Sequence, residues 1–212
     1  ELLKSSKIFK NKKISLLRDP AIDYEEILKN KNLQISNKFQ KKSYALSIGR
    51  LTKQKNFSFL VKMFSKYKKD INVDCLLIIG EGEEKIKLQK IIKKYRSENS
   101  IHLLGFKKNV YNYINKCKYL ISTAEYEDPG FALLEAAFLK KKIITSLVEN
   151  GPLEMKKNGN FCYFFNFNNE KSFVNAIKNS KVKNIKKIKD AHEYSKQFLI
   201  TLHCKKLKKI LN

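Results

Sequence analysis

From residue 44 onward, short apolar runs alternate with amphipathic stretches, and this alternation constrains the fold more than any other feature of the chain. The apolar runs predict six strands, at residues 44–48, 75–79, 101–104, 119–122, 143–146 and 162–165. The stretches between and after them have apolar residues at helical spacing and predict helices at residues 56–68, 83–96, 110–116, 132–139, 153–157 and 170–179. Strands that alternate with helices are typical of parallel sheets with crossover helices. We therefore predict a doubly wound α/β fold with a mostly parallel, six-stranded, Rossmann-like sheet.

The two ends of the chain are predicted to lie outside this sheet. Residues 1–40 are rich in Lys and Asn, contain a short predicted helix at 24–28, and are interpreted as an inter-domain linker. One long helix is predicted at residues 190–211, and its apolar stripe needs a surface to pack on; the stripe consists of Phe198, Leu199, Leu202, Leu207 and Ile210. The predicted organisation is an inter-domain linker with the remnant of an N-terminal domain at 1–40, a ligand-binding domain at 41–185 and a C-terminal helix at 186–212.

A net charge of +25 raises the question of a polyanionic partner. Of the 45 basic residues, only Arg18, Arg50 and Arg96 are arginine, although base reading and bidentate phosphate binding favour the planar guanidinium group. The joint abundance of Lys, Asn and Ile indicates a compositional bias. We expect a solvated lysine surface and no specific nucleic-acid partner. Peripheral contact with an anionic membrane surface stays open as an alternative.

The chain has no run of about 18 apolar residues, the length that a membrane-spanning helix needs. Its first residues do not have the pattern of a signal peptide. We therefore expect a cytoplasmic protein, with the inner face of the membrane as a possible site of contact. The four cysteines are far apart and have no zinc-type spacing, so we expect reduced, mostly buried thiols and no metal.

The loop after the first predicted strand, residues 49–56, has the composition of a phosphate-binding loop. Gly49 permits a sharp turn, and Asn56 is a plausible cap for the following helix. Arg50 and Lys55 place two cations beside that helix start, an arrangement that suits a diphosphate. Because lysine is abundant throughout the chain, a solvated basic turn explains these residues equally simply when they are taken alone.

Two further turns follow predicted strands and carry weaker signals. Gly80-Glu81-Gly82 superficially resembles a dinucleotide-binding turn, but the third glycine is missing and the acids after it would repel a pyrophosphate, so we reject an NAD site. Asn150-Gly151-Pro152 opens a short predicted helix after the fifth strand. This second turn either closes a sugar pocket or is an ordinary helix start.

The segment after the fourth strand carries the most specific pattern. Pro129 and Gly130 place a helix start near Gly130, so Glu127 precedes the helix and Glu135 lies inside it. At a rise of about 1.5 Å per residue, Glu135 lies about 7 Å along the axis from the helix start. The free backbone N–H groups of Gly130, Phe131 and Ala132 then lie between the two carboxylates.

A nucleoside diphosphate sugar has a matching layout. One carboxylate would accept hydrogen bonds from the ribose hydroxyls, the helix start with Arg50 and Lys55 would bind the diphosphate, and the other carboxylate would bind the sugar. The alternative is that both glutamates are simply solvated. Glu135 argues against that alternative, because its helix is otherwise almost entirely apolar and a carboxylate buried there is costly without partners.

Three segments together resemble the retaining glycosyltransferases of family four, which include many enzymes of bacterial surface polysaccharide synthesis. Gly49-Arg50-Leu51-x-x-Gln54-Lys55-Asn56 resembles the diphosphate loop of that family. Leu103-Leu104-Gly105-Phe106 resembles its strand and loop beside the base, and Glu127-x7-Glu135 resembles its paired-glutamate motif. The likeness extends from about residue 14 to the C-terminus and implies the donor-binding half of a GT-B fold.

The resemblance also implies roles for individual residues. Arg50 and Lys55 would bind the diphosphate and stabilise the leaving group, Glu127 would bind the donor sugar, and Glu135 the ribose. The remaining donor contacts would come from Gly49, Gly105, Phe106, Gly130, Phe131 and Ala132. Family members are described as retaining hexosyltransferase-type enzymes that need no metal or other cofactor. The segment Asp128-Pro129-Gly130-Phe131 departs from the common pattern, which leaves open which backbone N–H meets the phosphate.

The partner expected for this half is an N-terminal acceptor domain, which would bind a glycan or a lipid-linked glycan. Without that domain, the chain is expected to bind a nucleotide-sugar donor and to be inactive in transfer. The main alternative from another class is a non-catalytic module that binds nucleotides or polyanions. A sugar-nucleotide epimerase or a phosphorylase with the same two-lobed fold is a further alternative.

Overall fold

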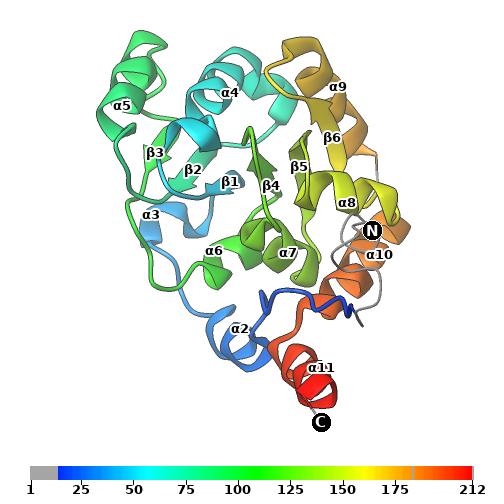
Figure 1. Ribbon diagram of the computed structural model, residues 1–212. Helices are drawn as coiled ribbons and strands as arrows, with labels where there is room; N and C mark the ends of the chain where they lie inside the picture. Colours follow the sequence, from blue (N-terminus) through cyan, green and yellow to red (C-terminus); the bar gives the residue numbers. More distant parts are fainter. Residues whose placement is uncertain (1–13, 183, 212) are drawn as a thin grey trace.

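The computed structural model describes residues 14–182 and 184–211 (Figure 1). In this part of the chain six strands form one sheet in the order β3-β2-β1-β4-β5-β6, and every pair is parallel. The strands are β1 (Tyr44–Ile48), β2 (Cys75–Ile79), β3 (Ile101–Leu103), β4 (Tyr119–Ser122), β5 (Lys142–Leu147) and β6 (Tyr163–Asn166). The predicted fold is confirmed, and each strand lies within about a residue of its predicted position.

Helices cover both faces of the sheet, which is why the strands have continuous apolar sequences (Figure 1). One core lies beneath α4 (Phe57–Ile71), α5 (Lys85–Lys94) and α9 (Glu170–Lys181). The other lies beneath α6 (Tyr111–Lys116), α7 (Phe131–Phe138), α8 (Gly151–Lys157) and α10 (Ile185–Ser195). All five residues of β2 are buried between these two layers.

The start of α4 differs from the sequence prediction. Asn56 does not cap the helix with its side chain; it has a left-handed backbone (φ 53°) after a 3-10 turn, η2 (Lys53–Lys55). Its side chain instead donates a hydrogen bond to Asn168 Oδ1 at 2.7 Å. Asparagine tolerates this conformation better than most residues, so it is suited to the junction between the turn and the helix.

The single long C-terminal helix predicted at residues 190–211 is wrong. The chain forms α10, a 3-10 turn η3 (Lys196–Phe198) and then α11 (Ile200–Leu211), with Leu199 extended between them. The break occurs because this stretch pairs with the N-terminal segment: Ile22 N donates to Phe198 O, and Ile200 N donates to Ile22 O, both at 3.0 Å. These long-range backbone bonds replace the intrahelical bonds that a continuous helix would make.

The N-terminal segment packs on the sheet domain. It forms α2 (Tyr24–Asn30) and α3 (Asn37–Gln40), and its Ile22, Ile27 and Phe39 belong to the α7-side core. The interpretation of residues 1–40 as a linker, and the boundaries at 41–185 and 186–212, stay predictions; residues 1–13 lie outside the described part.

The cysteines fit the expectation of reduced thiols. Cys75, Cys117 and Cys162 are buried and free, and Cys204 is exposed and free. Within residues 14–182 and 184–211, no helix has the length and hydrophobicity required to span a bilayer.

Candidate functional site

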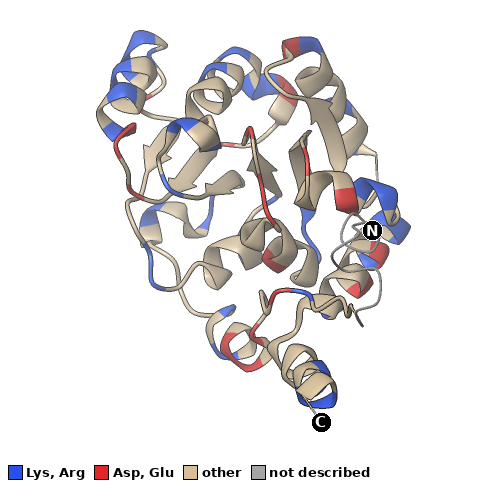
Figure 2. Cartoon of the chain, in the orientation of Figure 1, with Lys and Arg blue, Asp and Glu red and all other residues tan. Residues whose placement is uncertain are grey.

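The site lies where the sheet changes direction. From β1 the connections lead outward to β2 and β3 on one side, and from β4 they lead to β5 and β6 on the other. The connections of the neighbours β1 and β4 therefore diverge, and in doubly wound sheets ligands usually bind in a crevice at the carboxyl ends of such strands. The β1 loop (residues 49–56) and the β4–α7 loop (residues 123–130) form its two sides, with basic and acidic positions facing each other (Figure 2).

Hydrogen bonds join these two loops. The Thr123 hydroxyl lies 3.2 Å from Lys55 O and 3.0 Å from Asn56 O, as potential acceptors, and Thr123 is only 1% exposed. Glu125 N donates to Gln54 O at 2.8 Å, and Gln54 Nε2 donates to Tyr126 O at 3.1 Å. Because these hydrogen bonds involve backbone groups of both loops, they hold the two loops in a fixed relative position.

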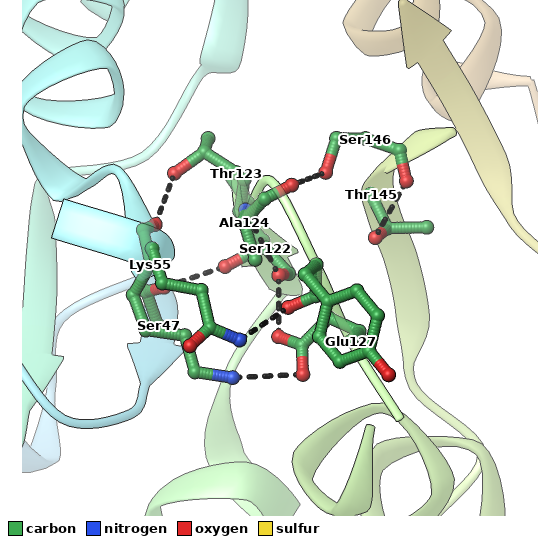
Figure 3. Close-up of polar contacts among 11 residues, drawn as sticks. Ser47, Lys55, Ser122, Thr123, Ala124, Glu127, Thr145 and Ser146 are labelled. Atoms are coloured by element: carbon green, nitrogen blue, oxygen red, sulfur yellow. Dashed lines mark hydrogen bonds and ion pairs between the residues drawn. The ribbon is translucent and has the colours of Figure 1, made fainter. Parts of the chain in front are cut away.

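Lys55 and Glu127 meet in this crevice. Lys55 Nζ donates to Glu127 Oε2 at 2.8 Å, and the Ser122 hydroxyl donates to Glu127 Oε1 at 3.1 Å (Figure 3). The Glu127 residue is 8% exposed and the Lys55 side chain 19% exposed. Both predicted residues are therefore part of one charged centre, and Glu127 is not the solvated loop acid of the alternative interpretation.

The glycines of the neighbouring loops permit close backbone contacts. A Cβ atom on Gly80 would lie 1.9 Å from Gly49 O, so only glycine lets the β2 loop approach the β1 loop this closely. Gly49 itself lies against the Lys55 side chain, 3.4 Å from where its Cβ would be. Arg50 follows Gly49 with an exposed side chain, in the same loop as Lys55, as predicted.

The helix α7 starts at the edge of the crevice. Gly130 precedes it with φ 86°, and the backbone N–H groups of Leu133 and Leu134 already bond to Gly130 O. The first N–H groups of a helix have no intrahelical acceptor, so those of Phe131 and Ala132 are free to meet an anion. The Phe131 side chain is 53% exposed.

Glu135 occupies a different environment from Glu127. It is half-buried on α7, and burial raises its pKa from 4.5 to about 7, an effect that a hydrogen bond with the Tyr111 hydroxyl partly opposes and the charge of Glu26 increases. Tyr111 begins α6 and Glu26 lies on α2. The prediction that Glu135 is not a freely solvated acid is confirmed.

The β3 loop extends the site on the α6 side. Gly105 has φ 70°, and its carbonyl accepts a hydrogen bond from Gly80 N at 3.0 Å. Phe106 follows it and is 74% exposed, so its ring is available to a ligand. The structure therefore links the β3 loop to the β1 loop through Gly80, and the predicted contact with a base stays a prediction.

The turn before α8 packs directly beside Glu127. Gly151 N donates to Glu127 O at 3.0 Å, and Asn150 forms an isolated parallel bridge with Glu127. Asn150 Nδ2 also donates to the hydroxyl of Tyr126 at 2.8 Å and to Asp128 Oδ2 at 3.2 Å. The turn therefore starts α8 and also contacts the segment around Glu127, and closure of a sugar pocket stays a prediction.

Sequence reasoning missed the hydroxyl residues that support the charged centre. Ser122 and Thr123 make these hydrogen bonds at the carboxyl end of β4 (Figure 3). Their signal lies in the sequence, because Ser122 ends an otherwise apolar strand and Thr123 follows it directly, where a purely structural strand would continue with aliphatic residues.

The family described as "Glycosyl transferases group 1" matches residues 29–198, which is most of the chain. The chain belongs to this family. The match includes the β1 loop, the β3 loop and both glutamates, so the segments that carried the sequence resemblance all lie inside it.

Two curated relatives are glycosyltransferases by name. The chain is 30% identical over 160 residues to a Campylobacter jejuni N-acetylgalactosamine-N,N'-diacetylbacillosaminyl-diphospho-undecaprenol 4-alpha-N-acetylgalactosaminyltransferase, covering 74% of this chain and 42% of the relative. It is 31% identical over 151 residues to an uncharacterized glycosyltransferase of Methanocaldococcus jannaschii, covering 70% and 37% respectively. The chain thus spans about two fifths of the length of these relatives.

Solved structures confirm the fold. The pneumococcal O-GlcNAc transferase GtfA, in complex with UDP and GlcNAc, superposes with a TM-score of 0.71 at 19% identity, covering 92% of this chain and 38% of that one. The fold is the Rossmann-like α/β fold of GT-B glycosyltransferases.

Proposed function

We propose that this chain binds a nucleoside diphosphate sugar and forms the donor-binding half of a retaining glycosyltransferase of hexosyltransferase type. The observation that carries this proposal is the Lys55–Glu127 pair, which lies at the direction change of the sheet beside the free N-terminus of α7. A cation and a helix start favour a diphosphate, and the adjacent carboxylate can accept hydrogen bonds from sugar hydroxyls.

The proposed roles follow the order of groups in such a donor. Lys55 and the exposed Arg50, with the first N–H groups of α7, bind the diphosphate and stabilise the negative charge that develops when it leaves. Glu127 binds the donor sugar. Glu135 accepts hydrogen bonds from the ribose hydroxyls, and the base lies towards the β3 loop.

The base contact is proposed for Gly105 and Phe106, since Phe106 is exposed in that loop and an aromatic face suits a planar base. We propose that no metal takes part and that the two cations perform the charge neutralisation. Attack on the same face from which the diphosphate leaves would give retention.

The acceptor is proposed to be a glycan or a lipid-linked glycan, bound by a further domain of the whole protein. The proposal is supported by the relatives, of which the chain covers 37% to 42%, and by the lipid-linked acceptor in the name of the Campylobacter protein. Contact with an anionic membrane surface is proposed for the same reason, and the net charge of +25 favours it.

Calorimetric titration with UDP, GDP and ADP tests the donor site. We expect one nucleotide to bind, and Lys55→Met to weaken it by about tenfold or more, because a charge-assisted contact to phosphate is lost. Lys53→Met is the matched control, since Lys53 lies in the same turn with an exposed side chain. A folded chain that binds none of the three nucleotides would contradict the proposal.

The two glutamates are tested separately. Glu135→Gln should weaken binding of the free nucleotide, because the ribose loses a charged acceptor. Glu127→Gln should change the affinity for the free nucleotide by no more than about twofold. It should weaken the affinity for the sugar conjugate several-fold, because a hydrogen bond to a charged group is lost. Equal and negligible effects of both substitutions would indicate that neither carboxylate contacts the donor.

The second candidate, a non-catalytic polyanion-binding module, is favoured by the net charge alone. Salt dependence separates the two. Polyanion binding through many lysines should fall steeply between about 50 and 200 mM salt. Nucleotide binding in the crevice should instead depend mainly on Lys55 and Arg50, with a much shallower dependence on salt.

A further inference from the structure

Two different contacts hold the carboxylate of Glu127, one on each oxygen. Lys55 Nζ lies 2.8 Å from Oε2, and the Ser122 hydroxyl lies 3.1 Å from Oε1 (Figure 3). Ser122 is the last residue of β4, and its backbone is paired with Thr145 of β5. The sheet therefore determines the position of one oxygen, and a flexible lysine side chain determines the position of the other.

Binding of the donor should affect the Lys55 contact and the Ser122 contact differently. In the proposed function Lys55 also binds the diphosphate, so the incoming phosphate and Glu127 share the three donors of one flexible ammonium group. The hydroxyl of Ser122 also accepts a long hydrogen bond from Ala124 N at 3.5 Å, and this bond leaves its proton for the contact with Glu127. Once Lys55 turns to the phosphate, Ser122 is the side chain that continues to hold the carboxylate in the ligand-free position.

We propose that Ser122 is a positioning residue for donor-sugar binding, which keeps Glu127 aimed into the crevice while Lys55 engages the diphosphate. This inference rests on the proposed role of Glu127 as the ligand of the donor sugar. By holding Oε1 against the strand end, the serine leaves the remaining lone pairs of the carboxylate for sugar hydroxyls and limits the side-chain rotamers that binding must freeze.

The neighbouring hydroxyl acts on the other partner of the pair. Successive residues of an extended chain point to opposite sides, and Thr123 directs its hydroxyl to the carbonyl groups of Lys55 and Asn56. Thr123 therefore positions the backbone of the β1 loop, whereas Ser122 positions Glu127 directly. Removing the two hydroxyls should have different consequences, which gives the experiment an internal contrast.

The experiment measures affinity for a free nucleotide and for its sugar conjugates in the same chain. The probes are whichever of UDP, GDP and ADP binds the wild type most tightly, together with its glucose and N-acetylglucosamine conjugates. Ser122→Ala should change the affinity for the free nucleotide by no more than about twofold. It should weaken the affinity for the tighter-binding conjugate by about fivefold to tenfold, the loss expected for one hydrogen bond to a charged group. Ser122→Thr keeps the hydroxyl and should restore most of the loss.

Two further variants separate positioning from a general structural effect. Thr123→Val should weaken the nucleotide and the conjugate by similar factors, because it acts through Lys55. Ser47→Ala is the control for removing a buried strand-end hydroxyl, since Ser47 donates to Ile121 O at 2.6 Å and does not contact Glu127. Ser47→Ala should change the affinity for the nucleotide and the affinity for the conjugate by no more than about twofold each, because its effect should be independent of the Glu127 contact.

A double-mutant cycle completes the test. In a Glu127→Ala background, Ser122→Ala should have no further effect on the conjugate, because the group that it positions is gone. Additive losses, or a Ser122→Ala loss shared equally by free nucleotide and conjugate, would overturn the inference. A wild type that binds the conjugates no more tightly than the nucleotide would also overturn it. Absence of binding to any of the three nucleotides would instead contradict the proposed function itself.

Discussion

At the scale of single residues, the two glutamates of the motif show how the surroundings separate similar side chains. Glu127 is buried but makes an ion pair with Lys55, so its charge is compensated. Glu135 is half-buried on an apolar helix and makes no ion pair within the described residues, and burial raises its pKa to about 7. Desolvation therefore makes the charged form of Glu135 costly until a ligand such as a ribose supplies hydrogen bonds.

The raised pKa of Glu135 predicts how stability depends on pH. The folded chain binds the proton of Glu135 more tightly than the unfolded chain does. The contribution of this residue to stability is therefore fully present below about pH 4.5 and is lost as pH rises through about 7. Glu135→Gln removes this loss. At pH 8 we expect the variant to have a free energy of unfolding about 2 kcal/mol above the wild type, allowing for partial exposure.

Urea titrations at pH 5 and pH 8 measure this difference. The variant and the wild type should differ little at pH 5, where Glu135 is largely protonated in the folded chain. Glu125→Gln, which neutralises an exposed acid in the β4–α7 loop, should follow the wild type at both values. A Glu135→Gln variant that is less stable than the wild type at pH 8 would show that the carboxylate has a compensating partner.

At the scale of elements, the site depends on loops that approach one another through glycines. The turn before α8 contacts the β4–α7 loop so closely that a Cβ atom on Gly151 would lie 2.0 Å from Pro129 O. The same turn donates a backbone hydrogen bond to Glu127 O. The position of Glu127 thus depends on β5 and α8 as well as on its own loop.

Gly151→Ala should accordingly damage both stability and the site. The clash is with backbone atoms, which cannot move aside cheaply, so we expect a loss of about 2 to 4 kcal/mol in the free energy of unfolding. Binding of a sugar conjugate should weaken along with stability. Gly49→Ala is the contrast for stability, because its Cβ would meet only the Lys55 side chain at 3.4 Å. Similar unfolding free energies for the two variants would contradict the close approach seen here.

At the scale of the whole molecule, one apolar surface remains uncovered in the described part of the chain. Residues Leu16, Leu207 and Ile210 are 77%, 37% and 47% exposed, and all three line a cavity of about 680 Å³ between the N-terminal segment and α11. Figure 1 shows α11 extending away from the sheet domain next to α2. A surface of this kind usually has a partner.

This surface should bind a hydrophobic dye in the isolated chain. Replacing Leu207 and Ile210 together by serine should reduce the dye fluorescence by at least about half without lowering the melting temperature, because these side chains are exposed and contribute little to the core. Val182→Ser is the control, since Val182 is 68% exposed elsewhere. An equal reduction by the control would mean that the dye does not report on this surface.

Residues 1–212 alone should bind a donor without transferring its sugar. Transfer needs an acceptor hydroxyl held against the anomeric carbon, and the chain covers about two fifths of its curated relatives. A radiolabelled-sugar transfer assay with lipid-linked glycan acceptors checks this, with and without an acceptor domain supplied from a relative. Sustained transfer by the chain alone would contradict the proposed division of roles.

Local patterns in the sequence were sufficient for the fold and for placing Glu127 and Glu135 on either side of a helix start. Strand and helix periodicity depends on neighbours within a few residues, so six strands and the start of α7 were predicted closely. The spacing of Glu127 and Glu135 around a helix start is equally local. These features could be derived because short-range geometry alone specifies them.

Tertiary structure alone decided the contacts between distant segments. Lys55 and Glu127 are 72 residues apart, and no periodicity indicates that they form an ion pair above Ser122. The break at Leu199 depends on backbone hydrogen bonds to Ile22, which are invisible to helical propensity. Such contacts form only when the parallel sheet brings the ends of β1 and β4 together, because side-chain pairing across a crevice depends on topology and not on local sequence.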